Sequence, residues 1–169
     1  MYESMFGNTE QVARAIAAGL RESLDVSMAD VSETPAAAAD EADLIVAGGP
    51  THAFSMSRMN TREDAISRGA DEAEREVGLR EWIDALPAGR SGGKLATFDT
   101  KVASMRHLPG SAAKGAARAG RRHGYELAEP AESFYVHDVK GPLLDGELER
   151  ATAWGRELAA SISGRAAQP

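Results

Sequence analysis

The sequence predicts an α/β protein built on a doubly wound, five-stranded parallel sheet with helices on both faces. Strand-like runs alternate with helix-like segments along the chain, which is the pattern of right-handed βαβ crossovers. The clearest strand, residues 43–49, is apolar from Leu44 on and ends in two glycines, as expected of a parallel strand buried on both faces. The 169 residues, of which 43% are hydrophobic, suffice for one domain. We expect this domain to span residues 1–163 and a disordered tail to occupy residues 164–169.

The other elements follow from shorter patterns. Val12, Ile16 and Leu20 recur at helical spacing, and Thr9 stands where an N-cap is expected. Residues 1–4 are short for a central strand, which needs about five residues, so we expect the natural chain to begin upstream of Met1. The remaining predictions are strands at 94–99 and 133–136, weaker strands at 1–4 and 25–28, and helices at 79–86, 111–123 and 148–162.

Composition excludes several classes of protein. The chain has no cysteine, which rules out disulfides, thiolate metal sites, iron–sulfur clusters and a cysteine nucleophile. His107, His123 and His137 show no metal-ligand spacing, so no metal site is expected. Nineteen basic against 26 acidic residues give a formal net charge of -7, which argues against nucleic acid as the partner. No apolar run approaches the ~20 residues of a membrane span and no signal peptide is evident, so we expect a cytoplasmic protein.

The most informative stretch is residues 2–10, which predicts a strand end, a polar turn and the start of a helix. A helix N-terminus presents free backbone N–H groups and the positive end of the helix dipole, so a tight turn there can hold an anion. Ser4, Asn8 and Thr9 would add hydrogen bonds, and Gly7 would let the backbone curl around a phosphate. The turn contains no Lys or Arg, so we expect neutral donors only. The same stretch also fits a capped helix after a simple turn.

Two more loops are predicted at the same edge of the sheet. Ligands of open α/β sheets bind beyond the carboxyl ends of the strands. Residues 48–54 and 97–101 follow the two best-defined strands. Together with residues 2–10, these loops predict a mononucleotide that carries a large planar group.

These motifs resemble the flavodoxin family. Tyr-Glu-Ser-Met-Phe-Gly-Asn-Thr at 2–9 resembles the family's phosphate loop, and Gly-Pro-Thr-His at 49–52 resembles its second flavin loop. The resemblance covers almost the whole chain and implies that FMN is the cofactor. The third flavin loop of flavodoxins is usually acidic and glycine-rich and contains a stacking tyrosine. Residues 97–101 match this loop poorly. The resemblance implies these cofactor-binding residues: Ser4, Met5, Phe6, Gly7, Asn8, Thr9, Pro50, Thr51, His52, Ala53, Phe54, Thr97, Phe98 and Asp99.

Several of these side chains have a second interpretation. His52 could contact the flavin, which we favour, or be an ordinary loop histidine. Phe54 could flank the ring or anchor its loop, and Phe98 fits core packing better. Asp99 and Lys101 could touch the polar edge of the flavin or form a solvated ion pair.

Three functions remain open. The chain could be an FMN electron carrier like a flavodoxin, or an FMN enzyme like the quinone reductases or protoporphyrinogen dehydrogenases of this fold. It could also be a flavin-free interaction module. A redox partner would be a protein or a small quinone-like acceptor. The sequence lacks the glycine motifs of P-loop NTPases and dinucleotide-binding folds, and the strand at 43–49 lacks the terminal aspartate of a receiver domain.

Two further features of the sequence concern the redox chemistry and the insert beside the site. Residues 51–55 contain no glycine, and a positive φ costs a non-glycine residue on the order of 1 kcal/mol. In the family a glycine there lets a peptide flip and stabilise the one-electron reduced flavin, so its absence favours two-electron chemistry. The insert at 55–78 is polar, and we expect its arginines to be solvated around a short helix starting near Thr61. This insert could also act as a lid.

Overall fold

The computed structural model describes residues 1–39, 41–70, 72, 76–87 and 93–166. Its parallel sheet has four strands, which are β1 (Leu44–Pro50), β2 (Lys94–Val102), β3 (Glu126–Leu127) and β4 (Glu132–Val136). Strand β2 is central, because it pairs with β1 along one edge and with β3 and then β4 along the other. The predicted α/β class with a parallel sheet is therefore confirmed, with four regular strands in place of five.

The N-terminal segment takes the place of the missing strand. Tyr2 forms isolated parallel bridges with Gly48 of β1 on one side and with Asp30 on the other. Residues 1–4 thus continue the sheet beyond β1, although too few of their backbone groups are paired to form a regular strand. The weak strand expected at 25–28 is absent from the described chain, and only the bridge at Asp30 lies close to it.

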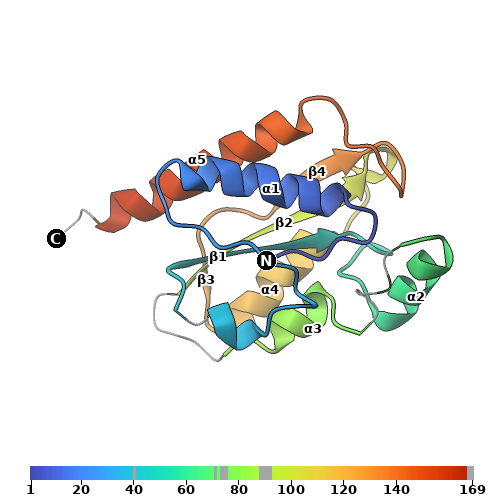
Figure 1. Ribbon diagram of the computed structural model, residues 1–169, viewed down its shortest axis with the longest axis horizontal. Helices are drawn as coiled ribbons and strands as arrows, with labels where there is room; N and C mark the ends of the chain where they lie inside the picture. Colours follow the sequence, from blue (N-terminus) through green and yellow to red (C-terminus); the bar gives the residue numbers. More distant parts are fainter. Residues whose placement is uncertain (40, 71, 73–75, 88–92, 167–169) are drawn as a thin grey trace.

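Helices cover both faces of the sheet. The five α-helices of the described residues are α1 (Asn8–Arg21), α2 (Met59–Ser67), α3 (Leu79–Asp84), α4 (Ala112–Arg122) and α5 (Glu147–Ala166). Helices α1 and α5 lie together on one face, whereas α3 and α4 cover the other (Figure 1). The close approach of α1 and α5 requires Gly19, since a Cβ there would lie 2.1 Å from the carbonyl oxygen of Thr152.

Each face of the sheet carries its own apolar core. On the α3–α4 face, Trp82 is buried with residues of β1 and β2. On the α1–α5 face, the rings of Phe98, Phe134 and Trp154 meet edge to face with centroids 6.2 to 6.5 Å apart. Both tryptophans therefore belong to the core, as their helical spacing predicts, and Phe98 belongs there too.

Two predicted boundaries change. Helix α1 begins at Asn8 directly after Gly7, so Gly7 and not Thr9 holds the N-cap position. Helix α5 continues through Gly164 to Ala166, where a disordered tail was expected, and residues 167–169 lie outside the described residues. Within the described chain, no helix combines the length and the apolar composition needed to cross a membrane.

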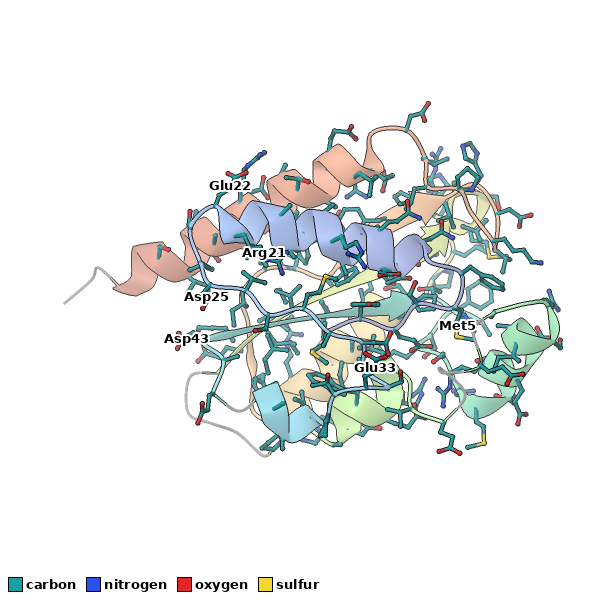
Figure 2. All side chains as sticks on the ribbon, viewed as in Figure 1. Met5, Arg21, Glu22, Asp25, Glu33 and Asp43 are labelled. Carbon is teal, nitrogen blue, oxygen red and sulfur yellow. The ribbon has the colours of Figure 1, made fainter. Side chains whose placement is uncertain are left out.

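The fold brings several loops to one end of the molecule. Strands β1, β2 and β4 all point to the right in Figure 1, where α1 begins and where α2 lies. Figure 2 places Met5 at this carboxyl end of the sheet, and Asp25 and Asp43 at the opposite end. The candidate site is built from the loops at the carboxyl end.

Candidate functional site

The first loop (residues 4–9) joins the N-terminal segment to α1. Gly7 has a φ of 80°, a left-handed conformation that glycine adopts without strain. The hydroxyl oxygen of Ser4 accepts a hydrogen bond from the backbone N–H of Glu10 at 3.1 Å, and the Gly7 carbonyl accepts one from the backbone N–H of Gln11. These two bonds fold the loop back onto the first turn of the helix.

The backbone of the first loop has unused donors. The five consecutive backbone N–H groups from Met5 to Thr9 donate no hydrogen bond to any described residue. These groups stand at the N-terminus of a 14-residue helix, where the helix dipole is positive. A run of free N–H groups at such a position is suited to bind a phosphate or another anion.

The side chains of the first loop have more varied roles than expected. Thr9 is 2% exposed, and its hydroxyl lies 2.8 Å from that of Thr100. This contact ties α1 to β2, so Thr9 offers only its backbone N–H to a ligand. Met5 is buried, whereas Phe6 and Asn8 are partly exposed.

The fourth loop (residues 137–146), which follows β4, lies against the first loop. The ammonium of Lys140 is 5.8 Å from the ring centroid of Phe6. Gly141 has a φ of 93°, which favours glycine, and a Cβ there would lie 2.4 Å from the Asn8 side-chain oxygen, so the two loops are in close contact. A lysine therefore stands beside the expected phosphate loop, where we had expected neutral donors only. Lys140 belongs to none of the sequence motifs described above, although residues that follow a strand of this sheet are expected at the ligand-binding edge.

The second loop (residues 51–58) follows β1 and contains a tight turn. His52 and Ser55 exchange backbone hydrogen bonds of 2.9 and 3.0 Å across this turn. The two central residues have positive φ, 45° for Ala53 and 64° for Phe54. Two-residue turns of this kind normally use Asn or Gly, and a non-glycine residue there stores on the order of 1 kcal/mol of strain. Phe54 is 47% exposed at the tip of the turn.

His52 is directed to the insert that follows the turn. Burial lowers the pKa of His52, although the nearby backbone of Thr61 in α2 opposes this shift. The ring is therefore neutral near pH 7. Flavin contact by His52 stays a prediction.

Thr51 and Asp99 are used to cap α4. The Thr51 hydroxyl donates to Asp99 Oδ2 at 2.8 Å and accepts from the backbone N–H of Ala112 at 2.8 Å. Asp99 Oδ2 also accepts from the backbone N–H of Ala113 at 3.0 Å. A carboxylate at a helix N-terminus is favoured by the helix dipole. Both side chains therefore hold the start of α4 against the sheet.

The third loop begins later than predicted. Strand β2 extends to Val102, so Thr97, Phe98 and Asp99 lie inside the strand, and the third loop is residues 103–110. These three residues are at most 1% exposed, and the site proposed below therefore does not include them. Lys101 is buried as well.

The predicted solvated ion pair of Asp99 and Lys101 is wrong. The ammonium of Lys101 donates to the carbonyl oxygens of Leu108 and Gly110 at 2.9 and 3.1 Å. The strand can continue through these polar residues because each finds partners in a distant loop or helix.

A second buried polar cluster joins the N-terminal segment, α2, α3 and the second loop. Arg62 and Glu3 are fully buried, so the expectation that the arginines of the insert are solvated is wrong for Arg62. The Arg62 guanidinium donates to the Ser57 hydroxyl and to Glu81 Oε2, both at 3.0 Å. Glu3 Oε2 accepts from the backbone N–H of Leu79 at 2.7 Å, and burial raises the pKa of Glu3. These contacts anchor α2 and argue against a freely moving lid.

Comparisons with known proteins agree with this architecture. The flavodoxin family model matches residues 1–85. An archaeal flavodoxin structure is 21% identical with a TM-score of 0.66, and the alignment covers 96% of this chain and 95% of that one. A flavodoxin from Streptococcus pneumoniae is 20% identical with a TM-score of 0.65, covering 94% of each chain.

A larger protein contains a similar domain. The flavodiiron core from Synechocystis is 16% identical with a TM-score of 0.63, and the alignment covers 97% of this chain but 35% of that one. No curated protein sequence matches this chain. The family match at residues 1–85 includes both the first and the second loop, and the solved flavodoxins align over nearly the full length. The chain belongs to the flavodoxin family.

Proposed function

We propose that this chain binds FMN at the carboxyl end of its sheet and transfers electrons through it. The observation that carries the proposal is the row of free N–H groups from Met5 to Thr9, which fits a phosphate dianion. Lys140 adds a positive charge next to this row, beside the ring of Phe6. Hydrogen bonds and charge therefore favour the same ligand group at the same place.

The second and third loops supply surroundings that suit the flavin ring. Phe54 is exposed at the turn, and Gly110 of the third loop lies directly behind it, since a Cβ there would be 2.4 Å from the Phe54 carbonyl oxygen. Met105 and Leu108 of the third loop are also exposed. We assign the ring to the surface formed by these two loops, because a planar aromatic ligand is bound mainly by apolar contact.

When bound, FMN supplies the redox chemistry, since it accepts one or two electrons. The residues of the chain bind and orient it. The first loop and Lys140 would hold the phosphate, and the turn at Ala53 and Phe54 would present backbone groups to the ring. His52, if it reaches the flavin, would act as a neutral hydrogen-bonding group.

We further propose that reduction by two electrons predominates. The turn has no glycine, and both Ala53 and Phe54 already have strained left-handed conformations. A peptide flip in such a turn is more restricted than in a glycine turn. This restriction supports a two-electron oxidoreductase, such as a quinone reductase, over a one-electron carrier.

The electron acceptor would approach at the same end of the molecule. All six large hydrophobic side chains that are exposed in the described chain come from segments that follow β1, β2 or β4: Phe54, Met59, Met105, Leu108, Val139 and Leu148. Exposed apolar side chains in the segments that follow these strands favour contact with a partner protein or an apolar acceptor.

The absorbance spectrum of the purified protein tests FMN binding. We expect a yellow protein with a flavin spectrum, or a colourless protein that gains this spectrum when FMN is added. Failure to bind FMN in both cases would overturn the proposal and favour a flavin-free interaction module.

Anaerobic photoreduction of the FMN complex tests the electron count. We expect direct bleaching with little of the one-electron reduced form. Near-stoichiometric accumulation of that form, with its long-wavelength absorbance, would favour the carrier. An assay of NAD(P)H-dependent quinone reduction then separates an enzyme from a carrier.

A further inference from the structure

Arg80, the second residue of α3, holds the second loop through one guanidinium group. Its Nε donates to the Ser57 carbonyl oxygen at 3.1 Å. Its Nη2 donates to the Ser55 hydroxyl and to the Met56 carbonyl oxygen, both at 3.0 Å. One side chain thus binds three consecutive residues of the second loop.

The partners of Arg80 are all neutral. Among the described residues Arg80 forms no ion pair, although most ion pairs of the described chain involve an arginine. Hydrogen bonds from a charged guanidinium to carbonyl and hydroxyl oxygens are stronger than those between neutral groups. Arg80 is also only partly exposed, which limits competition from water. This arrangement indicates that the guanidinium stabilises the conformation of the second loop.

The held segment directly follows the strained turn. Ala53 and Phe54 have positive φ, and their conformation persists only if the surrounding structure determines it. The backbone pair of His52 and Ser55 closes the turn, and Gly110 packs behind it. Arg80 fixes the chain on the far side of Ser55, so that the end of the turn cannot shift.

We propose that Arg80 is a positioning residue of the flavin site, which keeps the turn at Ala53 and Phe54 in the conformation that meets the ring. The proposal rests on the proposed function only in naming FMN as the ligand. Lysine cannot replace Arg80, because a single ammonium does not provide the planar fork that spans three acceptors. Arg80→Gln and Arg80→Lys should therefore have similar effects.

Hydrogen exchange of the flavin-free protein tests whether Arg80 holds the second loop in place. In both Arg80 variants we expect the amides of residues 52–57 to exchange about tenfold faster or more, as expected for loss of a charge-assisted hydrogen bond. Arg58→Gln is the matched control, because Arg58 is an exposed arginine of the same loop. Unchanged exchange in the Arg80 variants, or an equal increase in the control, would overturn the proposal.

Ligand titration then separates a positioning role from a purely structural one. A displaced turn should weaken FMN and riboflavin binding by the same factor of about ten, since the ring contact is lost and the phosphate contact is kept. Faster loop exchange with unchanged affinity for both ligands would make Arg80 a structural residue only. If the wild-type protein binds neither ligand, the proposed function fails and the role in a flavin site fails with it, while the exchange measurement still reports whether Arg80 holds the loop.

Discussion

The first and second loops lie at the same end of the sheet but are stabilised in opposite ways. In the first loop, the N–H groups from Met5 to Thr9 have no acceptor within the described chain. In the second loop, Ser55, Met56 and Ser57 accept hydrogen bonds from two arginines that belong to α2 and α3. The protein thus leaves the donors of the first loop unsatisfied and holds the second loop in place.

This difference suits a site that binds two chemically distinct parts of one ligand. Free backbone donors favour an anion, because its binding satisfies groups that otherwise rely on water. A flat ring offers few hydrogen bonds, and a loop that is already ordered loses little entropy when it binds one. Removal of free donors from the first loop should therefore change ligand affinity, whereas release of the second loop should change loop order first and ring binding as a consequence.

The largest effect is expected at Arg62, which joins α2 to the second loop and to α3. Arg62→Met would remove the cation next to the buried carboxyl of Glu3 and leave the Ser57 hydroxyl without this donor. We expect the free energy of unfolding to fall by roughly 2–3 kcal/mol, because several hydrogen bonds from a buried guanidinium are lost together. Chemical denaturation measures this loss. Arg58→Met, at an exposed arginine nearby, is the control, and equal small losses in both variants would contradict the assigned role.

The next effect separates two neighbours in the first loop. Asn8→Ala should weaken FMN binding by about 1–2 kcal/mol, because its amide is available to the phosphate, and should leave the stability of the flavin-free protein nearly unchanged. Thr9→Val should lower the stability of the flavin-free protein and leave FMN affinity nearly unchanged, since the Thr9 hydroxyl bonds to Thr100 inside the protein. Calorimetric titration and thermal unfolding together measure both. The assignment fails if Thr9→Val lowers FMN affinity more than Asn8→Ala does.

A stabilising substitution is expected in the second loop. Ala53 has a φ of 45°, so Ala53→Gly should relieve strain and raise the free energy of unfolding by about 0.5–1 kcal/mol. Ala37→Gly, at an exposed site without positive φ, should instead destabilise the protein. Both are measured by denaturation. A loss of stability in Ala53→Gly would show that the turn is not strained.

The smallest effect concerns pH. Burial lowers the pKa of His52 in the folded protein, despite the opposing influence of Asp64, while Arg62 lowers it further. The unfolded chain then binds more protons than the folded one, so stability should fall as the pH drops below about 6.5, the ordinary histidine pKa. His52→Gln should reduce this slope between pH 7 and 5, and His123→Gln serves as the control. A slope unchanged by His52→Gln would refute the assignment.

The sequence alone predicts the elements whose signals are local. Strand β1 is an uninterrupted apolar run, and α1 has a regular apolar stripe from Val12 to Leu20. The first loop is evident because Gly7 and its polar neighbours stand directly before that stripe. These features depend only on residues that are neighbours in sequence, so local patterns predict them correctly.

Other features depend on partners that are distant along the chain. Strand β2 is longer than predicted because Asp99 Oδ2 accepts hydrogen bonds from Thr51 and α4, and Lys101 donates to carbonyls of the third loop. Arg62 looks like a surface residue in sequence and is buried because Ser57 and Glu81 meet it in space. No local pattern distinguishes such an arginine from its solvated neighbours.

In the proposed site, the free N–H groups of the first loop bind the phosphate of FMN. Titration of the flavin-free protein with FMN and with riboflavin, under identical conditions, tests it most directly. Since the phosphate would accept at least two charge-assisted hydrogen bonds, we expect FMN to bind about 100-fold more tightly or more. Equal affinity for FMN and riboflavin would contradict the account.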